Sequence, residues 1–131
     1  MPDPHRIAIR IYYEDTDFSG FVYHAAYLKF FERGRTEFLR DLGVHHAELA
    51  AQGIAFAVRR MEVDFEAAAR IDDLLSVDTA VEGGSGARLV LNQTILRGET
   101  VLTRARVEVA AVRIGGGATR LPKTLLERLR S

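Results

Sequence analysis

The chain opens with an alternation of hydrophobic and polar positions that changes to a helical period at His24. Within residues 6–13, isoleucines at every second position share one face, which predicts a half-buried strand. From His24 onward, hydrophobic residues recur at intervals of three and four, as on one side of an amphipathic helix. This stripe consists of Tyr27, Phe30, Phe31, Gly34, Phe38 and Leu42. We therefore predict one strand followed by one long helix that ends near Gly43, a residue type common just after helices.

Gly34 occupies the hydrophobic stripe in the middle of the predicted helix. A glycine in a helix interior costs about 1 kcal/mol relative to alanine, so its presence needs a reason. Its place on the apolar side predicts that another segment packs closely against the helix there.

The remainder of the chain follows the two-residue period of strands, interrupted by turn residues. The alternating segments are residues 54–58, 61–65, 75–81, 89–95 and 101–111. The first two alternate in opposite phase, and a β-bulge at Arg59 and Arg60 would return both to the same face of the sheet. Short helices are predicted over residues 45–52 and after Leu121–Pro122.

This order of elements predicts an α+β fold. Consecutive strands joined by short turns pair antiparallel, and one long helix has to bury its apolar stripe against the resulting sheet. We therefore expect a single domain over residues 1–131, with a curved antiparallel sheet of five strands packed on one helix. The strand edges left over favour pairing with a partner chain.

Composition excludes several classes of protein. The 131 residues are 47% hydrophobic and 27% charged, as in ordinary folded domains, and there is no cysteine for a disulfide, a thiolate nucleophile or a Cys-ligated metal. Eighteen basic and eighteen acidic residues cancel, which disfavours nucleic-acid binding. No apolar run is long enough for a membrane span, and the first residues show no signal pattern, so we expect a cytoplasmic protein.

A polar loop before the long helix carries the most informative side chains. It contains Asp15 and Asp17, then Gly20, and leads into His24. The unpaired N–H groups and partial positive charge of a helix start can stabilise an oxyanion and keep a neighbouring carboxylate ionised. Such a pairing suits hydrolysis of an acyl group. Acids before a helix are more often caps and solvated loop residues, so residue types and spacing alone favour a structural loop over a catalytic one.

A longer comparison of motifs favours the hydrolytic alternative. Residues 12–37, YYEDTDFSGFVYHAAYLKFFERGRTE, closely resemble the hot-dog acyl-CoA thioesterases, and most closely their Tol–Pal-associated branch, which is related to 4-hydroxybenzoyl-CoA thioesterase. Residues 59–65, 69–73 and 120–122 resemble that branch as well. One departure is Ala68, where the branch often has proline.

The resemblance implies a hot-dog fold, in which a sheet wraps a long central helix, and it implies roles for individual residues. Asp17 is the catalytic carboxylate, as nucleophile or as general base, and His24 lies beside it. The backbone N–H groups of Val22, Tyr23 and His24 are the expected oxyanion donors. Tyr27 either lines the acyl pocket or is a core aromatic of the helix stripe.

Further residues have expected roles in substrate binding or in the loop. Gly20 would let a substrate carbonyl approach the backbone, and Arg59 and Arg60 are candidates for the phosphates of coenzyme A. Asp15 is expected to organise the loop. His45 and its neighbours lack the spacing of a metal site, so no metal is expected.

The resulting hypothesis is an acyl-CoA thioester hydrolase without a metal or redox cofactor, since coenzyme A is part of the substrate. The resemblance implies a homodimer or homotetramer with the pocket between subunits, and acyl carrier protein is an alternative thiol carrier. Two other functions stay open at this point. One is a hot-dog hydratase or dehydratase acting on acyl thioesters, and the other is a non-catalytic binding subunit of an envelope or lipid-synthesis complex.

Overall fold

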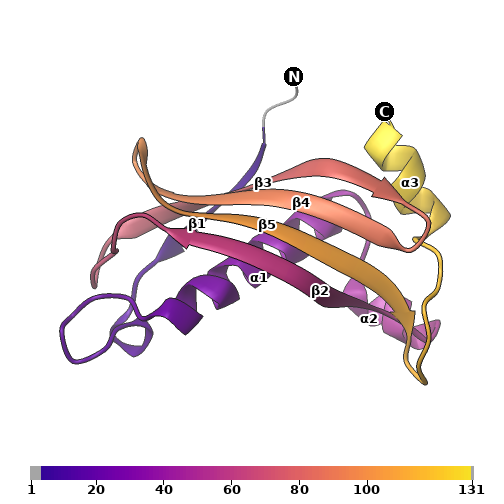
Figure 1. Ribbon diagram of the computed structural model, residues 1–131, viewed down its shortest axis with the longest axis horizontal. Coiled ribbons are helices and arrows are strands. Elements are labelled where there is room, and N and C mark those ends of the chain that lie inside the picture. Colours follow the sequence, from indigo (N-terminus) through magenta and orange to yellow (C-terminus); the bar gives the residue numbers. More distant parts are fainter. Residues whose placement is uncertain (1–3, 131) are drawn as a thin grey trace.

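The computed structural model describes residues 4–130, so the two ends of the domain predicted over 1–131 lie outside the described residues. It contains one five-stranded antiparallel sheet that curves over the long helix α1, with two shorter helices at the far end (Figure 1). The elements are β1 (His5–Arg10), the 3₁₀ turn η1 (Tyr13–Asp15), α1 (His24–Asp41), α2 (His46–Ala51), β2 (Ile54–Phe65), β3 (Leu74–Ser85), β4 (Arg88–Arg97), β5 (Thr100–Arg113) and α3 (Lys123–Arg130). The predicted α+β arrangement is confirmed.

The order of strands in the sheet is β1-β3-β4-β5-β2, and it corrects the simple expectation that consecutive strands pair. Tight turns do join β3 to β4 and β4 to β5, but β2 pairs with β5 at one edge and β1 with β3 at the other. Residues 66–73 connect β2, at one edge, to β3, which lies next to β1 near the opposite edge, and must therefore cross over β5 and β4. This crossover later proves to hold the candidate site.

The elements begin and end close to the predicted positions, apart from the ends of β1 and β3. The register of β2 against β5 shifts between Val58 and Arg60, which confirms the predicted bulge. By contrast, β3 continues to Ser85, because its glycine-rich end still pairs with β4. The first strand ends at Arg10, and the chain then turns into η1, although Ile11 remains buried.

The core lies between α1 and the concave side of the sheet. The helix contributes Phe30 and Phe31, both almost fully buried, from its predicted stripe. The sheet contributes aliphatic side chains from its central strands. They include Leu75, Val77, Leu89, Leu91, Ile95 and Val107. The helix is 18 residues long, about 27 Å.

Gly34 lies where the helix and sheet come closest. A β-carbon built on Gly34 would stand 2.8 Å from Val77 Cγ1, 3.1 Å from Gln93 Nε2 and 3.2 Å from Thr79 Oγ1. The predicted close approach is confirmed, and the neighbours are side chains of β3 and β4.

The crowding atoms at this point belong to a buried polar network and have little freedom to move. The Gln93 amide donates to the Phe31 carbonyl oxygen and to Thr79 Oγ1, both at 2.9 Å, and accepts from Arg35 Nη1 at 3.1 Å. An added methyl group must displace these bonds or the helix itself.

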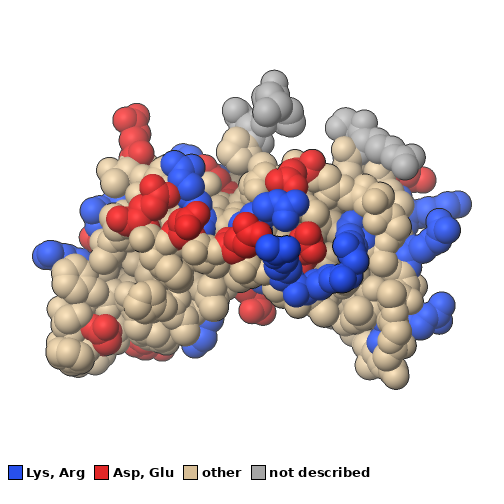
Figure 2. All heavy atoms as spheres, viewed as in Figure 1, with Lys and Arg blue, Asp and Glu red and all other residues tan. Residues whose placement is uncertain are grey.

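The exposed face carries both signs of charge side by side, in keeping with the net charge of zero (Figure 2). Ion pairs account for part of this pattern, including Arg106 with Glu82 at 2.7 Å and Arg104 with Glu66 at 2.8 Å. Among residues 4–130, none of the helices combines the length and hydropathy needed to cross a bilayer.

The packing at Gly34 leads to a stability prediction. Overpacking costs roughly 1–3 kcal/mol and alanine returns about 1 kcal/mol of helix propensity, so we expect Gly34→Ala to lower the free energy of unfolding by about 1 kcal/mol, the middle of the resulting range. Urea unfolding of the two proteins measures the difference. Gly115→Ala is the matched control, because no atom lies within 4 Å of a β-carbon there. A variant as stable as the wild type would contradict the close-packing argument.

Candidate active site

The loop before α1 is closed by short hydrogen bonds around Asp17. Thr16 and Val22 form an isolated antiparallel bridge, and the Asp17 N–H donates to the Phe21 carbonyl oxygen at 3.0 Å. The Gly20 N–H donates to the Asp17 carbonyl oxygen at 3.0 Å, and Gly20 has a φ of +84°, a conformation that glycine adopts without strain. The turn thus returns the chain toward the start of α1 and keeps Asp17 next to it.

The carboxylate of Asp17 is exposed on this turn, and its two oxygens differ. Oδ1 accepts hydrogen bonds from the Ser19 N–H, at 2.9 Å, and from the Ser19 hydroxyl. Within residues 4–130, no side chain or backbone group of another residue donates a hydrogen bond to Oδ2. The Ser19 hydroxyl, then the Ser19 N–H, and to a smaller degree the N–H of Asp17 itself and the nearby His24 hold the pKa of Asp17 below its ordinary value. Asp17 is therefore an ionised carboxylate with one oxygen open to a ligand.

The crossover of residues 66–73 holds the loop from the other side. The Val22 N–H donates to the Ala69 carbonyl oxygen at 2.9 Å, and the Ile71 N–H donates to the Gly20 carbonyl oxygen at 3.3 Å. Arg70 places its guanidinium 4.7 Å from the centroid of the Phe21 ring. The loop that carries Asp17 is thereby attached to the sheet at several points.

Asp73 in turn fixes the crossover. Its Oδ2 accepts from the Arg70 N–H at 2.9 Å and from Arg97 Nη1 at 3.0 Å. These two donors, the Arg70 N–H first, hold the pKa of Asp73 below its ordinary value. Sequence reasoning noted this segment only as part of a resemblance and missed its supporting role, because that role depends on contacts between distant parts of the chain.

Two of the three expected oxyanion donors are already engaged. The Val22 N–H donates to Ala69, as described, and the Tyr23 N–H donates to the Asp15 carbonyl oxygen at 3.3 Å. The His24 N–H, at the first residue of α1, has no partner among the described residues. The donor role can therefore be carried by His24 but not by Val22 or Tyr23 while this loop keeps its hydrogen bonds.

Asp15 has the loop-organising position that the sequence predicted. Its Oδ2 accepts a hydrogen bond from the Tyr12 N–H at 2.9 Å. Together with the bond from Tyr23 to its carbonyl oxygen, this spans the loop from its first residues to the helix start.

Phe65 lies beside His24 and was not singled out from the sequence. The exposed imidazole of His24 meets the ring of Phe65 edge to face, with centroids 5.0 Å apart. Phe65 is the last residue of β2 and is 45% exposed, so it forms an apolar surface near the helix start. Only the three-dimensional arrangement brings the end of β2 to this position.

Tyr27 is buried on the apolar stripe of α1. It is only 3% exposed, and its hydroxyl oxygen accepts a hydrogen bond from the Ala69 N–H at 2.9 Å. Burial raises the pKa of this hydroxyl. The side chain thus ties α1 to the crossover, and its contact with an acyl group stays a prediction.

Arg59 and Arg60 lie on the exposed middle of β2, away from the helix start. Arg60 pairs with Glu62 at 2.8 Å, whereas Arg59 has no ion-pair partner among residues 4–130. Arg60 is five residues from Phe65, or roughly 17 Å along an extended strand. The structure does not bring these arginines to Asp17 within one chain.

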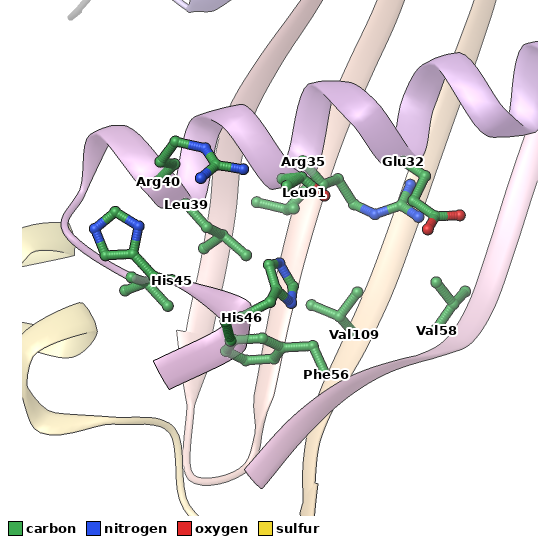
Figure 3. A pocket seen from close by; sticks show the side chains of 13 residues that line it. Glu32, Arg35, Leu39, Arg40, His45, His46, Phe56, Val58, Leu91 and Val109 are labelled. Carbon is green, nitrogen blue, oxygen red and sulfur yellow. The ribbon is translucent and has the colours of Figure 1, made fainter. Parts of the chain in front are cut away.

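A cavity of about 590 Å³ lies beneath the second half of α1 (Figure 3). Leu39, Phe56 and Val109 give it an apolar wall, while Arg35 and His46 add polar groups from α1 and α2. Asp17 is not among its lining residues. Within the described part of the chain, no group of three or more His, Asp or Glu side chains is arranged to hold a metal ion.

Comparison with known proteins places this geometry in a family. Residues 12–129 match the family described as the Thioesterase-like superfamily. Over 108 residues the chain is 46% identical to "Acyl-CoA thioesterase YbgC" of Haemophilus influenzae, covering 82% of this chain and 79% of that protein. It is 45% identical to "Acyl-CoA thioester hydrolase YbgC" of Escherichia coli O157:H7, covering 82% and 81%.

Solved structures agree with the sequence relatives. A "Probable Thioesterase" from Bartonella henselae superimposes with a TM-score of 0.88 at 48% identity, over 91% of this chain and 99% of that one. By sequence and by architecture, this chain belongs to the thioesterase-like superfamily and has its hot-dog fold, as the motif around Asp17 predicted.

Proposed function

We propose that this protein hydrolyses acyl-CoA thioesters to a carboxylic acid and free coenzyme A, with Asp17 as the catalytic residue. One observation carries the proposal: an ionised carboxylate with an open oxygen lies at the start of α1, on a loop fixed to the sheet. The relatives named as acyl-CoA thioesterases support the choice of substrate.

The exposed position of Asp17 is compatible with two routes. In the first, Oδ2 attacks the thioester carbonyl carbon, the C–S bond breaks and coenzyme A leaves as the thiolate. Water then cleaves the acyl-aspartyl anhydride, which gives the acid and restores the carboxylate. In the second, Oδ2 takes a proton from water as hydroxide forms the bond to carbon, and the proton passes to the departing thiolate.

We take the first route as the working mechanism because Oδ2 is exposed and accepts no hydrogen bond from residues 4–130, so it can reach the thioester carbon directly. The lowered pKa of Asp17 keeps the carboxylate ionised, as either route requires.

The first turn of α1 supplies the remaining elements of the mechanism. The N–H of His24 is the donor proposed for the oxyanion, since it lies at the positive end of the helix and has no partner among the described residues. The His24 imidazole is proposed to orient the substrate or the water. Gly20 leaves room beside the loop, because a β-carbon there would meet nothing within 4 Å.

We extend the proposal to an assembly of two or four chains with the substrate bound between them. The support is the outer edge of β2, a strand of 12 residues that pairs with β5 on one side only. Val58 and Phe65 are exposed along it, and unpaired edges of this length are commonly covered in native proteins. Asp17 is also exposed within a single chain, which leaves room for a partner to complete the pocket.

Several finer proposals follow the same resemblance. Arg59 and Arg60 are proposed to bind the phosphates of coenzyme A, with acyl carrier protein as an alternative thiol carrier. The reaction is proposed to need no metal or redox cofactor, because Asp17 and a helix amide supply the chemistry. We also propose that the protein acts in the cytoplasm, within the Tol–Pal-associated branch related to 4-hydroxybenzoyl-CoA thioesterase.

One prediction of the proposed function concerns Asp17 itself. Asp17→Ala is expected to lower kcat/KM by about 100-fold or more, since it removes the only proposed nucleophile or base. The temperature of unfolding should stay within a few degrees of the wild type, because the side chain is exposed on a loop. The assay is free thiol release from a panel of short aliphatic, long aliphatic and aromatic acyl-CoA thioesters.

Glu14→Ala is the matched control, because it removes an exposed acid from the same loop and should keep activity within a few-fold. Activity of the Asp17 variant within a few-fold of the wild type would reject the assignment. If the wild type changes an alkene bond without releasing thiol, the protein is a hydratase or dehydratase. If it acts on no thioester at all, the non-catalytic alternative is favoured.

The second prediction separates the two routes. In a single turnover in ¹⁸O-water, the nucleophilic route with water attacking the aspartyl carbonyl transfers an unlabelled oxygen from Asp17 to the product. We expect unlabelled acid in the first turnover and label in later ones, as measured by mass spectrometry of the released acid. Acid that carries one ¹⁸O atom from the first turnover would exclude this path and leave general-base catalysis or water attack on the acyl carbonyl of the anhydride, of which only the nucleophilic route passes through a covalent intermediate that hydroxylamine can trap.

A further inference from the structure

Ser19 makes an unusual pair of contacts with the candidate catalytic residue. Its backbone N–H and its hydroxyl both donate to the same oxygen, Oδ1 of Asp17. The Phe21 N–H approaches the Ser19 hydroxyl oxygen at 3.4 Å. A donor on that side of the oxygen leaves the hydroxyl hydrogen directed toward Asp17.

The hydroxyl is not needed to close the loop. The bonds from the Asp17 N–H to Phe21 and from the Gly20 N–H to Asp17 already form the turn. The Ser19 N–H alone would satisfy the usual contact between an aspartate and the residue two positions later. The hydroxyl therefore donates to the carboxylate, and its one backbone contact is the long one from the Phe21 N–H at 3.4 Å.

An exposed aspartate without such contacts samples several side-chain rotamers, and either oxygen can face a substrate. Two donors on Oδ1 restrict the carboxylate to one orientation. They also occupy the oxygen that they contact, so that Oδ2 alone is presented. This is the geometry that a reaction at one defined oxygen requires.

We propose that Ser19 is a positioning residue for thioester hydrolysis, in which its N–H and hydroxyl hold Oδ1 of Asp17 so that Oδ2 reacts. This inference rests on the proposed function and deepens it. Ser19 itself touches neither the substrate nor the reacting atoms in this role.

The ionisation of Asp17 agrees with this geometry. The hydroxyl of Ser19 is the largest cause of the lowered pKa of Asp17, ahead of the Ser19 N–H. A group with a lowered pKa stays ionised to lower pH. Loss of the hydroxyl must therefore raise the pKa of Asp17 and move the acidic limb of the activity profile to higher pH.

The test compares Ser19→Ala with Ser19→Thr, which keeps a hydroxyl. We expect Ser19→Ala to lower kcat by about three- to tenfold, since hydrogen bonds to charged groups are among the stronger ones. KM should stay within about twofold, because the hydroxyl is not proposed to contact substrate, and the acidic limb of kcat should shift to higher pH. Ser19→Thr should restore most of kcat and the position of the limb.

A second measurement needs no turnover. Titration of the ¹³C-labelled Asp17 carboxyl by NMR, assigned with Asp17→Asn, should give a higher pKa in Ser19→Ala than in the wild type. In Ser19→Thr the pKa should lie close to that of the wild type. Ser85→Ala is the matched control, because Ser85 lies at the exposed end of β3. It should change neither kcat nor the titration.

Each other result would overturn the inference. An unchanged acidic limb and an unchanged titration in Ser19→Ala would show that the hydroxyl does not act on Asp17. A rise in KM alone would make Ser19 a substrate contact, and loss of the fold would make it a structural residue. If the wild type releases no thiol from any acyl-CoA, the proposed function itself fails, whatever the titration shows.

Discussion

The hydrogen bonds between the loop before α1 and the crossover of residues 66–73 determine where the carboxylate of Asp17, the proposed catalytic group, lies. Val22 donates to Ala69 and Ile71 donates to Gly20, so the loop is paired with a segment that is anchored in the sheet at both ends. The crossover exists because β2 pairs with β5 and not with β3. The strand order of the sheet therefore determines the position of Asp17 through these two backbone hydrogen bonds.

Burial and charge reinforce this attachment in different ways. Tyr27 reaches from the core side of α1 to the Ala69 N–H, and so fixes the helix start relative to the crossover. Asp73 and Arg97 join the crossover to the end of β4 through a charged contact at 3.0 Å. The buried Tyr27 hydroxyl carries no charge at neutral pH, so its contact does not depend on salt, whereas the charged pair is partly exposed and weakens as salt rises.

Local patterns in the sequence were sufficient for the elements, and a long motif was sufficient for the family. The alternation over 54–65 predicts both the strand and its bulge, and Gly34 on the apolar stripe predicts the close approach of helix and sheet. Asp17 was found because its neighbours form one continuous motif. Pairing between β2 and β5 was not predictable from short-range pattern, because it joins segments about fifty residues apart. For the same reason, the hydrogen bond from the Val22 N–H to Ala69 and the contact of Phe65 with His24 were not predictable from the sequence.

The contacts that set the charge of Asp17 come from residues within the same short turn, while the 590 Å³ cavity is formed by the second half of α1, α2 and the sheet. The pKa of Asp17 and the shape of the cavity are consequently determined by separate stretches of the chain. Mutational drift in one stretch can proceed without disturbing the other. Related proteins with this fold can therefore differ in the shape of that cavity while Asp17 stays ionised over the same range of pH.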